Sequence, residues 1–447
     1  MLRKTIILVA LALLFGAGAA EAAEETVRCW NHELQPYRDL VRSVPPDQMV
    51  PTNAGDHPMA PPDNPDVGDS WLWYTWLLNG FPVYEEKMCT VRGEGENVYV
   101  VVEDSQWLTN VDQEDVDAIV EAWDNSSLGM HSDMGIYDIN TTYFGPAPDA
   151  LDDDPKIYVL YYDFDVAADG FFWIFDQYPD GSQQFASNEC EVLYMNSSDF
   201  DPGGEYLIAV QAHEFEHQIH WLADENESSW VDEGMAELAM WLYGNPDNVS
   251  GFPNQPDNDL TDFGGAWSDY IQVYLWTLYF FEQFDLSVDA VRTVMDEPAN
   301  STVGYDNALA VLGSDRDFRA LFSDWTCANY LDDPDFEDGR YGYVGEELPA
   351  FNAALQNAYP IPPTEAFVRG YAADYVRMID GLPQRLHFDG DNIGTWAPRV
   401  LLMDGEETVG VGSIPLDGED VGSFDLFDFG ETHDTAVLVV GKYSPPS

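Results

Sequence analysis

His213, Glu214 and His217 stand at the spacing of the zinc-binding pattern H-E-x-x-H. The composition of the chain gives about 0.01 expected chance occurrences of this pattern, so chance is a poor explanation for it. On an α-helix successive residues turn by about 100°, which places the two imidazoles on one face, one turn apart. Imidazoles placed in this way converge on one tetrahedral Zn²⁺. The spacing therefore predicts a metal site on a helix.

A second segment, residues 230–237, supplies the groups that would complete such a site. Glu233 is the predicted third ligand, which leaves the fourth position of the metal open for water, as a catalytic zinc site requires. Glu237 lies one helical turn further and is predicted to hold a ligand imidazole through its other ring nitrogen. Gly234 has no side chain, so this helix would be able to approach a neighbouring helix closely.

Glu214 has the position of a general base beside the two histidines. It would take a proton from the water that attacks a carbonyl group, which zinc makes feasible near neutral pH. Glu216 lies on the other flank of the histidine face and is interpreted as a solvated side chain. His220 is assigned beside the ligands or to the wall of the cleft, although a His217–His220 ligand pair is an alternative. A structural metal site or an inert polar helix face is the competing interpretation.

Apolar residues in both segments indicate how the two helices would be held in place. In each segment they lie opposite the polar face, so one side would pack on the core and the other would face a cleft. They are Ile208, Phe215, Ile219 and Leu222 in the first segment, and Val231, Met235, Leu238, Ala239 and Leu242 in the second. The polar residues 224–229 suit a connection between two helices.

Residues 212–220 and 230–237 together resemble the gluzincin metallopeptidases, notably the secreted hyicolysin-like and immune-inhibitor-A-like enzymes. Weaker similarity is found at residues 187–194, 270–284 and 322–333, so the resemblance covers about residues 66–345. It implies an α+β fold with a zincin-like catalytic domain, in which a mainly helical C-terminal subdomain follows the H-E-x-x-H helix.

The same resemblance implies that a tyrosine after the third ligand stabilises the oxyanion of the tetrahedral intermediate, where one donor is worth about 2.7–4 kcal/mol. Tyr270 is the first choice for this role and Tyr274 the second. Packing within an aromatic helix is the alternative role for either. The chain departs from the family pattern at Asp232, which stands before Glu233 where asparagine is expected.

The N-terminus has the parts of a secretory signal peptide. Arg3 and Lys4 precede the apolar run Ile6–Phe15, and residues 20–22 form an A-x-A signal with cleavage expected after Ala22. No later stretch approaches the roughly 18 apolar residues of a membrane-spanning helix. We therefore expect a secreted or periplasmic protein with no membrane partner.

The formal net charge of the chain is −65, from 82 acidic and 17 basic residues. Aspartates outnumber glutamates by 52 to 30, and only four residues are lysine. Nucleic acids and anionic membranes are poor partners for such a surface. The hydrophobic content of 45% argues for packed domains rather than disorder. We expect a halophilic monomer that acts on a protein or peptide, with salt screening its self-repulsion.

Calcium binding is the other use for clustered carboxylates. Residues 257–259 and 332–335 are rich in oxygen ligands, but neither has the spacing of an EF-hand, so solvated acidic loops are the favoured interpretation. In an oxidising compartment, up to two disulfides in three alternative pairings are expected from the cysteines. These are Cys29, Cys89, Cys190 and Cys327, which are too scattered for a zinc ribbon.

The chain is expected to divide into a signal peptide (1–22), a lead-in segment or propeptide (23–65), a metallopeptidase domain (66–345), a connector (346–383) and an antiparallel β-sandwich module (384–447). Strands are predicted at 71–79, 83–91, 97–102, 156–162, 399–403, 408–411, 423–427 and 436–440. A helix is predicted at 116–123, and residues 269–331 are expected to be mainly helical and to close the far side of the cleft.

The combined expectation is an exported zinc-dependent endopeptidase with Glu214 as general base. The competing class is a non-enzymatic secreted binding protein that keeps a zinc-peptidase fold as its scaffold. Glu214 distinguishes the two, because a binding module has no chemical need for a base beside two ligands.

The acidic composition predicts that the protein loses stability when salt is removed. Unscreened repulsion among the carboxylates would lower the melting temperature in about 50 mM KCl relative to about 2 M KCl, where the Debye length is below about 3 Å. Thermal unfolding followed by circular dichroism at both salt concentrations measures this. Equal melting temperatures would contradict the halophilic interpretation.

Overall fold

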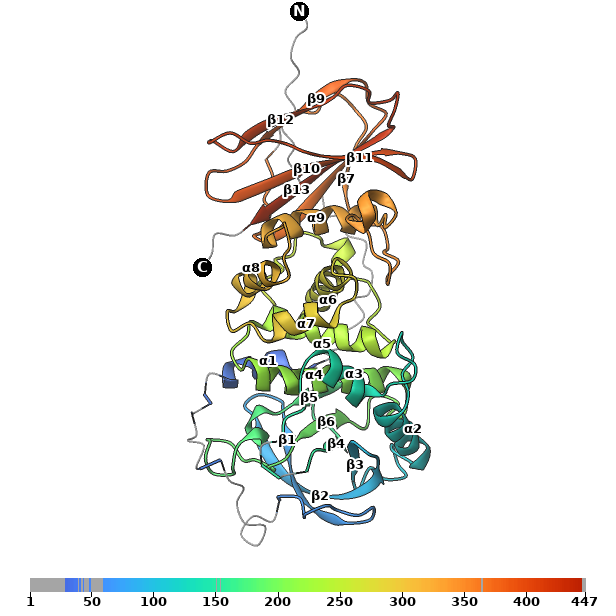
Figure 1. Cartoon of the computed structure of the whole chain (residues 1–447), viewed down its shortest axis with the longest axis vertical. Helices are drawn as coiled ribbons and strands as arrows, with labels where there is room; N and C mark the ends of the chain where they lie inside the picture. The colour runs from blue at the N-terminus through green and yellow to red at the C-terminus, as the bar shows by residue number, and fades with distance from the viewer. Residues whose placement is uncertain are drawn as a thin grey trace, which may run out of the picture.

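The computed structural model describes residues 29–38, 40–41, 43, 48–49, 59–149, 151–152, 154–362 and 365–443. Within these ranges the protein is a mixed α+β structure. Figure 1 shows a β-sheet at one end of an elongated molecule, a helical region in the middle and further sheets at the other end. The predicted signal peptide and about half of the predicted lead-in segment lie outside the described residues.

The first sheet contains six strands in the order β1-β2-β3-β4-β6-β5. Its strands are β1 (Ser70–Leu77), β2 (Val83–Glu94), β3 (Val98–Glu103), β4 (Ile157–Tyr162), β5 (Gly170–Phe172) and β6 (Val192–Asn196). β3, β4 and β6 run parallel, and the other pairs are antiparallel. The four strands predicted in this region are confirmed, and all belong to one sheet. The short strand β5 forms the edge nearest to the predicted site.

Helices α2 (Gln113–Asp124) and α4 (Glu205–Ala223) pack on this sheet, and α3 (Ile136–Tyr143) and α5 (Ser229–Tyr243) pack on α4 (Figure 1). A helix is found at the predicted position 116–123, and the segments 212–220 and 230–237 lie within α4 and α5, with the polar connection between them. Gln211 of α4 donates to the Tyr161 hydroxyl of β4, at 2.8 Å, and so ties α4 to the sheet.

The prediction that α4 has one buried and one open face is wrong. Residues 207–221 are all buried, because α4 lies between the sheet and the helices α3 and α5. Leu222, expected in the core stripe, is 51% exposed, whereas Phe215 and Ile219 are buried as expected.

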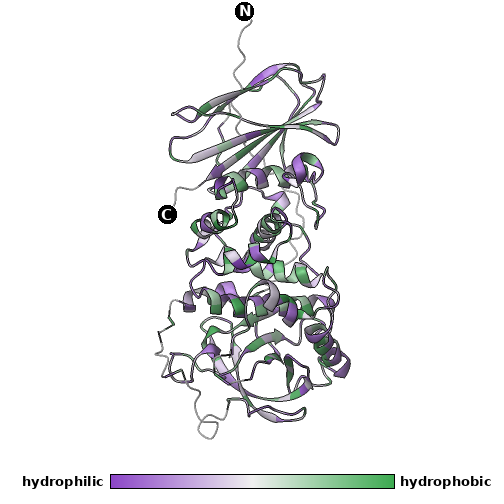
Figure 2. Cartoon of the chain, viewed as in Figure 1, coloured by the Kyte–Doolittle hydropathy of each residue, from purple (hydrophilic) through white to green (hydrophobic). Residues whose placement is uncertain are grey.

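Helix α5 approaches a neighbouring helix closely at Gly234, as predicted. A Cβ atom on Gly234 would lie 2.4 Å from Thr277 Oγ1 on helix α6 (Trp267–Glu282). A side chain at this position would therefore force Thr277 or α6 to shift. The remaining helices, α7 (Val288–Met295), α8 (Ser301–Val311) and α9 (Phe318–Leu331), confirm that the region 269–331 is mainly helical. In Figure 2, α5 and α6 are largely hydrophobic, which fits their burial in the middle of the molecule.

The C-terminal part contains a five-stranded sheet, β11-β10-β13-β8-β7, and a two-stranded sheet, β12-β9. The strands are β7 (Ala354–Gln356), β8 (Ala372–Ile379), β9 (Gln384–Asp389), β10 (Thr395–Asp404), β11 (Glu407–Ser413), β12 (Val421–Leu426) and β13 (Thr435–Tyr443). Met378, Leu386 and Leu438 share a second apolar core that joins the two sheets. Val437 and Val439 instead belong to the main core, which also contains residues of α9.

Two features of this part differ from the prediction. β7 and β8 lie within residues 346–383, which were predicted to be a connector, and β7 pairs with β8 in parallel rather than antiparallel. β8 is an inner strand that pairs with β13, more than fifty residues later in the chain. The strands predicted at 399–403, 408–411, 423–427 and 436–440 correspond to β10–β13. Among the described residues, none of the helices combines the length and hydrophobicity needed to cross a bilayer.

Candidate metal centre

α4 and α5 bring the three predicted ligands together in the buried interior. His213 Nε2 and His217 Nε2 are 3.1 Å apart. The Glu233 Oε2 atom lies 3.4 Å from the first nitrogen and 3.7 Å from the second. Around a tetrahedral zinc with ligand distances of about 2.0–2.1 Å, two such ligand atoms stand about 3.3 Å apart. The three separations lie on either side of this value, so the three residues form a grouping that could hold a metal ion.

The carboxylate of Glu233 provides a separate test of this fit. Both of its oxygens are buried, and neither accepts a hydrogen bond from the described residues. Burial raises the pKa of this carboxyl, but the imidazoles of His217 and His213 lower it to about 2. An ionised buried carboxylate without donors is costly unless a cation balances it. The donor set and its unmet charge therefore fit a divalent metal.

The outer ring nitrogens of both histidines face carboxylates, which orients the inner nitrogens toward one point. His217 Nδ1 is 2.9 Å from Asp232 Oδ1, and His213 Nδ1 is 3.5 Å from Glu237 Oε1. Glu237 thus lies where it was predicted, although the contact is long for a hydrogen bond. Carboxylates in this position fix the tautomer and orientation of metal-binding histidines.

Asp232 is a residue of the candidate site to which the sequence alone assigns no role. Its carboxylate orients His217, and it also accepts a hydrogen bond from Arg38 Nη1, at 2.7 Å. Burial alone raises the pKa of Asp232, but Arg38 and His217 together hold it well below its usual range. The one signal for it in the sequence is its position just before Glu233, where it marks a departure from the family pattern.

The structure corrects the predicted solvation of Glu216 and places His220 beside the predicted ligands. Glu216 is fully buried rather than solvated. Its Oε1 atom is 3.1 Å from His220 Nδ1, and burial raises the pKa of Glu216, which the neighbouring His220 partly offsets. His220 Nδ1 also lies 3.5 Å from Asp232 Oδ1. His220 therefore supports the carboxylate that orients His217, and the alternative His217–His220 ligand pair is not formed.

Glu214, the predicted base, is buried beside the ligands. Burial raises the pKa of its carboxyl, and the imidazoles of His213 and His217 oppose this effect. Its Oε2 atom accepts a hydrogen bond from Asn31 Nδ2, at 2.9 Å. Asn31 begins helix α1 (Asn31–Arg38), which packs against the site from the predicted lead-in segment.

The structure distinguishes the two tyrosines considered for oxyanion stabilisation. The Tyr270 hydroxyl donates to the backbone carbonyl of Cys29, at 3.2 Å, and Cys29 belongs to the same buried grouping as the predicted ligands. The Tyr274 hydroxyl instead donates to Glu346, at 2.7 Å. Tyr270 is therefore the tyrosine whose hydroxyl contacts the segment that covers the centre.

Cys29 joins the three predicted ligands. Its Sγ atom lies 3.6 Å from His217 Nε2, although the two residues are 188 positions apart in sequence. Cys29, His213, His217 and Glu233 form one buried grouping with all ligand atoms within 4.8 Å of one another. The disulfide prediction is wrong, since all four cysteines are free and buried in the structure. Sequence spacing offered no signal for this contact.

The two stretches considered for calcium serve as hydrogen-bonded loops. Asp257 accepts from the Arg369 backbone, and Asp332 accepts from the backbones of Tyr343 and Leu348. Neither stretch is among the groupings within the described residues that could hold a metal. A different acidic grouping, made of Asp149, Asp152 and Glu191, meets that criterion.

Comparisons of the chain with protein-family models and with curated proteins gave no match.

The contact between Asp232 and His217 predicts that Asp232→Asn weakens metal binding. Loss of such an orienting carboxylate is expected to reduce zinc affinity by about 10–100-fold. Glu237→Gln should cause a smaller loss, because its oxygen lies 3.5 Å from His213 Nδ1 rather than at hydrogen-bond distance. Competition with a zinc chelator measures both affinities, and Asp262→Asn on the exposed surface is the control. An unchanged affinity for Asp232→Asn would remove this residue from the metal centre.

Proposed function

We propose that the protein is an exported zinc-dependent endopeptidase with a zincin-like fold of the gluzincin type. The observation that carries this proposal is the convergence of His213, His217 and Glu233 beside the buried carboxylate of Glu214. Two imidazoles and one carboxylate are a common ligand set of catalytic zinc. The resemblance of the two helical segments to gluzincins supports the same assignment. The acidic composition supports action in a saline medium.

The residues of the chain have separable roles in this proposal. When bound, zinc would supply a Lewis acid and lower the pKa of a coordinated water. Glu214 would accept the proton of the attacking water and later deliver it to the leaving amine. Tyr270 would donate its hydroxyl hydrogen to the carbonyl oxygen as negative charge develops there. Asp232 would keep the imidazole of His217 in the orientation that presents Nε2 to the metal.

One observation favours the competing class, a non-enzymatic binding protein. A zinc site with four protein ligands is typical of structural zinc, whereas a catalytic site keeps one position open. With Cys29 counted, the grouping has four ligands. The presence of Glu214 and Tyr270 favours the enzyme, because a structural site needs neither a base nor an oxyanion donor.

The proposed role of Glu214 predicts that Glu214→Gln abolishes peptide hydrolysis without loss of zinc. Removal of a general base should lower the rate of casein digestion in high salt by about 10²–10⁴-fold. Glutamine keeps the shape of the side chain and can still accept the hydrogen bond from Asn31. Zinc content, measured by atomic emission, should stay equal to that of the parent.

Because Cys29 lies against the ligands, the comparison is made in the native chain and in a Cys29→Ser background. Glu225→Gln, on the exposed loop before α5, is the matched surface control and should digest casein normally. Digestion that is measurable and equal for parent and Glu214→Gln, in either background, would overturn the mechanism. Bound zinc without hydrolysis in either background would favour the binding-protein class.

The different contacts of the two tyrosines predict different effects on catalysis. Tyr270→Phe should lower kcat by about 10²–10³-fold with little change in KM, since an oxyanion donor acts mainly in the transition state. Tyr274→Phe should change kcat by far less, because its hydroxyl is bonded to Glu346. Steady-state kinetics with a peptide substrate measure both constants. Equal kcat values for the two variants would leave Tyr270 a packing role only.

A further inference from the structure

We infer that Cys29 is the fourth ligand of the metal, and that the segment 29–38 keeps the chain latent by closing the site. The ligand assignment rests on the geometry of the site, and the latency rests on the proposed peptidase function. Release of the segment would convert a closed four-ligand site into the open three-ligand site that catalysis requires.

The position of the Cys29 sulfur agrees with direct ligation. For a tetrahedral zinc with a sulfur ligand at about 2.3 Å and a nitrogen ligand at about 2.05 Å, the two ligand atoms stand about 3.6 Å apart. The Cys29 Sγ atom is 3.6 Å from His217 Nε2. Both oxygens of Glu233, in the same grouping, lack a hydrogen-bond donor among the described residues. The sulfur therefore lies where a fourth ligand would stand, in a grouping whose buried Glu233 carboxylate has no hydrogen-bond donor among the described residues.

The same segment contacts the other groups that the proposed reaction uses. Asn31 donates to the Glu214 carboxylate, the predicted base. The carbonyl oxygen of Cys29 accepts the hydroxyl hydrogen of Tyr270, as a substrate carbonyl would. Arg38, at the end of α1, donates to Asp232 behind His217. A segment that merely packed on the surface would have no reason to engage all of these groups.

Backbone contacts hold the segment along the free edge of the first sheet. The Trp30 N–H donates to the Gly170 carbonyl, at 3.1 Å. The Phe172 N–H donates to the side-chain oxygen of Asn31, also at 3.1 Å. Exposed strand edges accept extended peptides in this way. Residues 30 and 31 of the segment therefore occupy the β5 edge, where an extended peptide would otherwise pair with the sheet.

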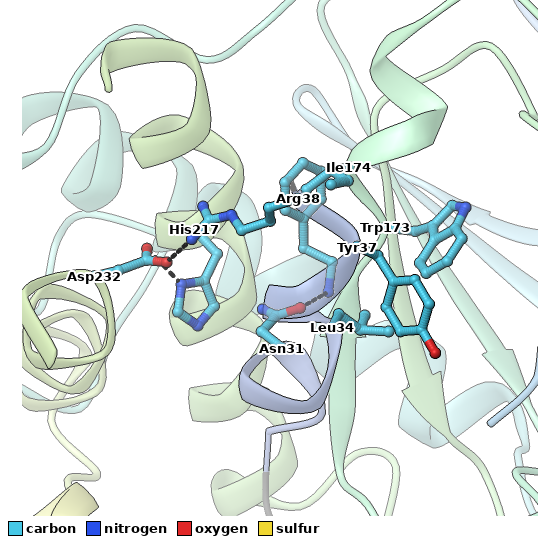
Figure 3. A pocket seen from close by; sticks show the side chains of 9 residues that line it. Asn31, Leu34, Tyr37, Arg38, Trp173, Ile174, His217 and Asp232 are labelled. Atoms are coloured by element: carbon cyan, nitrogen blue, oxygen red, sulfur yellow. Dashed lines mark hydrogen bonds and ion pairs between the residues drawn. The ribbon is translucent and has the colours of Figure 1, made fainter. Parts of the chain in front are cut away.

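A small pocket between α1 and β5 shows how the segment covers the ligands (Figure 3). Leu34 and Tyr37 form its wall on the side of α1, and Trp173 lies on the side of the sheet. His217 and Asp232 also line the pocket and lie at the end opposite Trp173 (Figure 3). Since α1 forms one wall of this pocket, its departure would leave His217 facing an open groove.

The proposed change from the closed form, with Cys29 bound to the metal, to the open form needs only the exchange of one ligand and one proton. In the closed state the Cys29 thiol has lost its proton to solvent, and a metal–sulfur bond is formed. On release the metal–sulfur bond breaks, water takes the vacated position, and the thiolate regains a proton from solvent. No oxidant or reductant is required.

X-ray absorption of the zinc-loaded full-length protein tests the ligand assignment directly. The native chain should show one sulfur neighbour at about 2.3 Å beside nitrogen and oxygen neighbours at about 2.0–2.1 Å. Cys29→Ser should lose the sulfur signal and keep bound zinc. Cys89→Ser, at a buried free cysteine of β2, is the matched control and should keep the signal. Absence of sulfur in the native chain would overturn the inference.

Casein digestion tests the latency. The variant Cys29→Ser with Arg38→Ala should digest casein at least about tenfold faster than the native chain, because rate follows the fraction of molecules with an open site. If that variant loses zinc, a chain with a specific protease site inserted within residues 51–58 is compared before and after cleavage. Equal rates in native and opened chains would overturn latency while the peptidase function stands. A sulfur ligand with no hydrolysis in any form would instead identify a structural site and overturn the proposed function.

Discussion

The packing of α4 against α5 is the constraint on which the rest of the site depends. It brings two imidazoles and a carboxylate within 4 Å of one another in the buried interior. Charged groups are costly there unless each has a partner. The absence of a side chain at Gly234 brings α5 close to α6, and Gln211 ties α4 to the sheet. Together these contacts hold the His213, His217 and Glu233 side-chain atoms at separations that a single metal ion can bridge.

The site is more strongly acidic than its ligand set alone requires. Besides Glu233, four further carboxylates surround the two imidazoles, and all are buried. They are Glu214, Glu216, Asp232 and Glu237. Arg38 balances part of this charge from outside the two helices, through Asp232, and its guanidinium also lies over the Trp221 ring. The segment 29–38 therefore contacts, through Arg38 and Asp232, the side chain of His217 in the candidate metal centre.

Whether such a centre is structural or catalytic depends on the fourth ligand. The H-E-x-x-H helix and Glu233 are the same in both cases, because they supply three ligands either way. With Cys29 in place the set is closed, and with Cys29 displaced a water can enter. In our proposal the chemical character of the site thus depends on a residue far from the motif, on the segment that lies along the sheet edge.

Local spacing in the sequence was sufficient to predict the elements that carry the ligands. The helical period identified His213, His217 and Glu233, and turn residues located most strands, because these signals depend on near neighbours in the chain. Only the tertiary structure revealed the contact of Cys29 with His217, the burial of Glu216 and the inner strand β8. Each of these arises from residues distant in sequence, where no period relates the partners. The sequence by itself determined which residues can bind a metal, and the fold decided that a fourth one joins them.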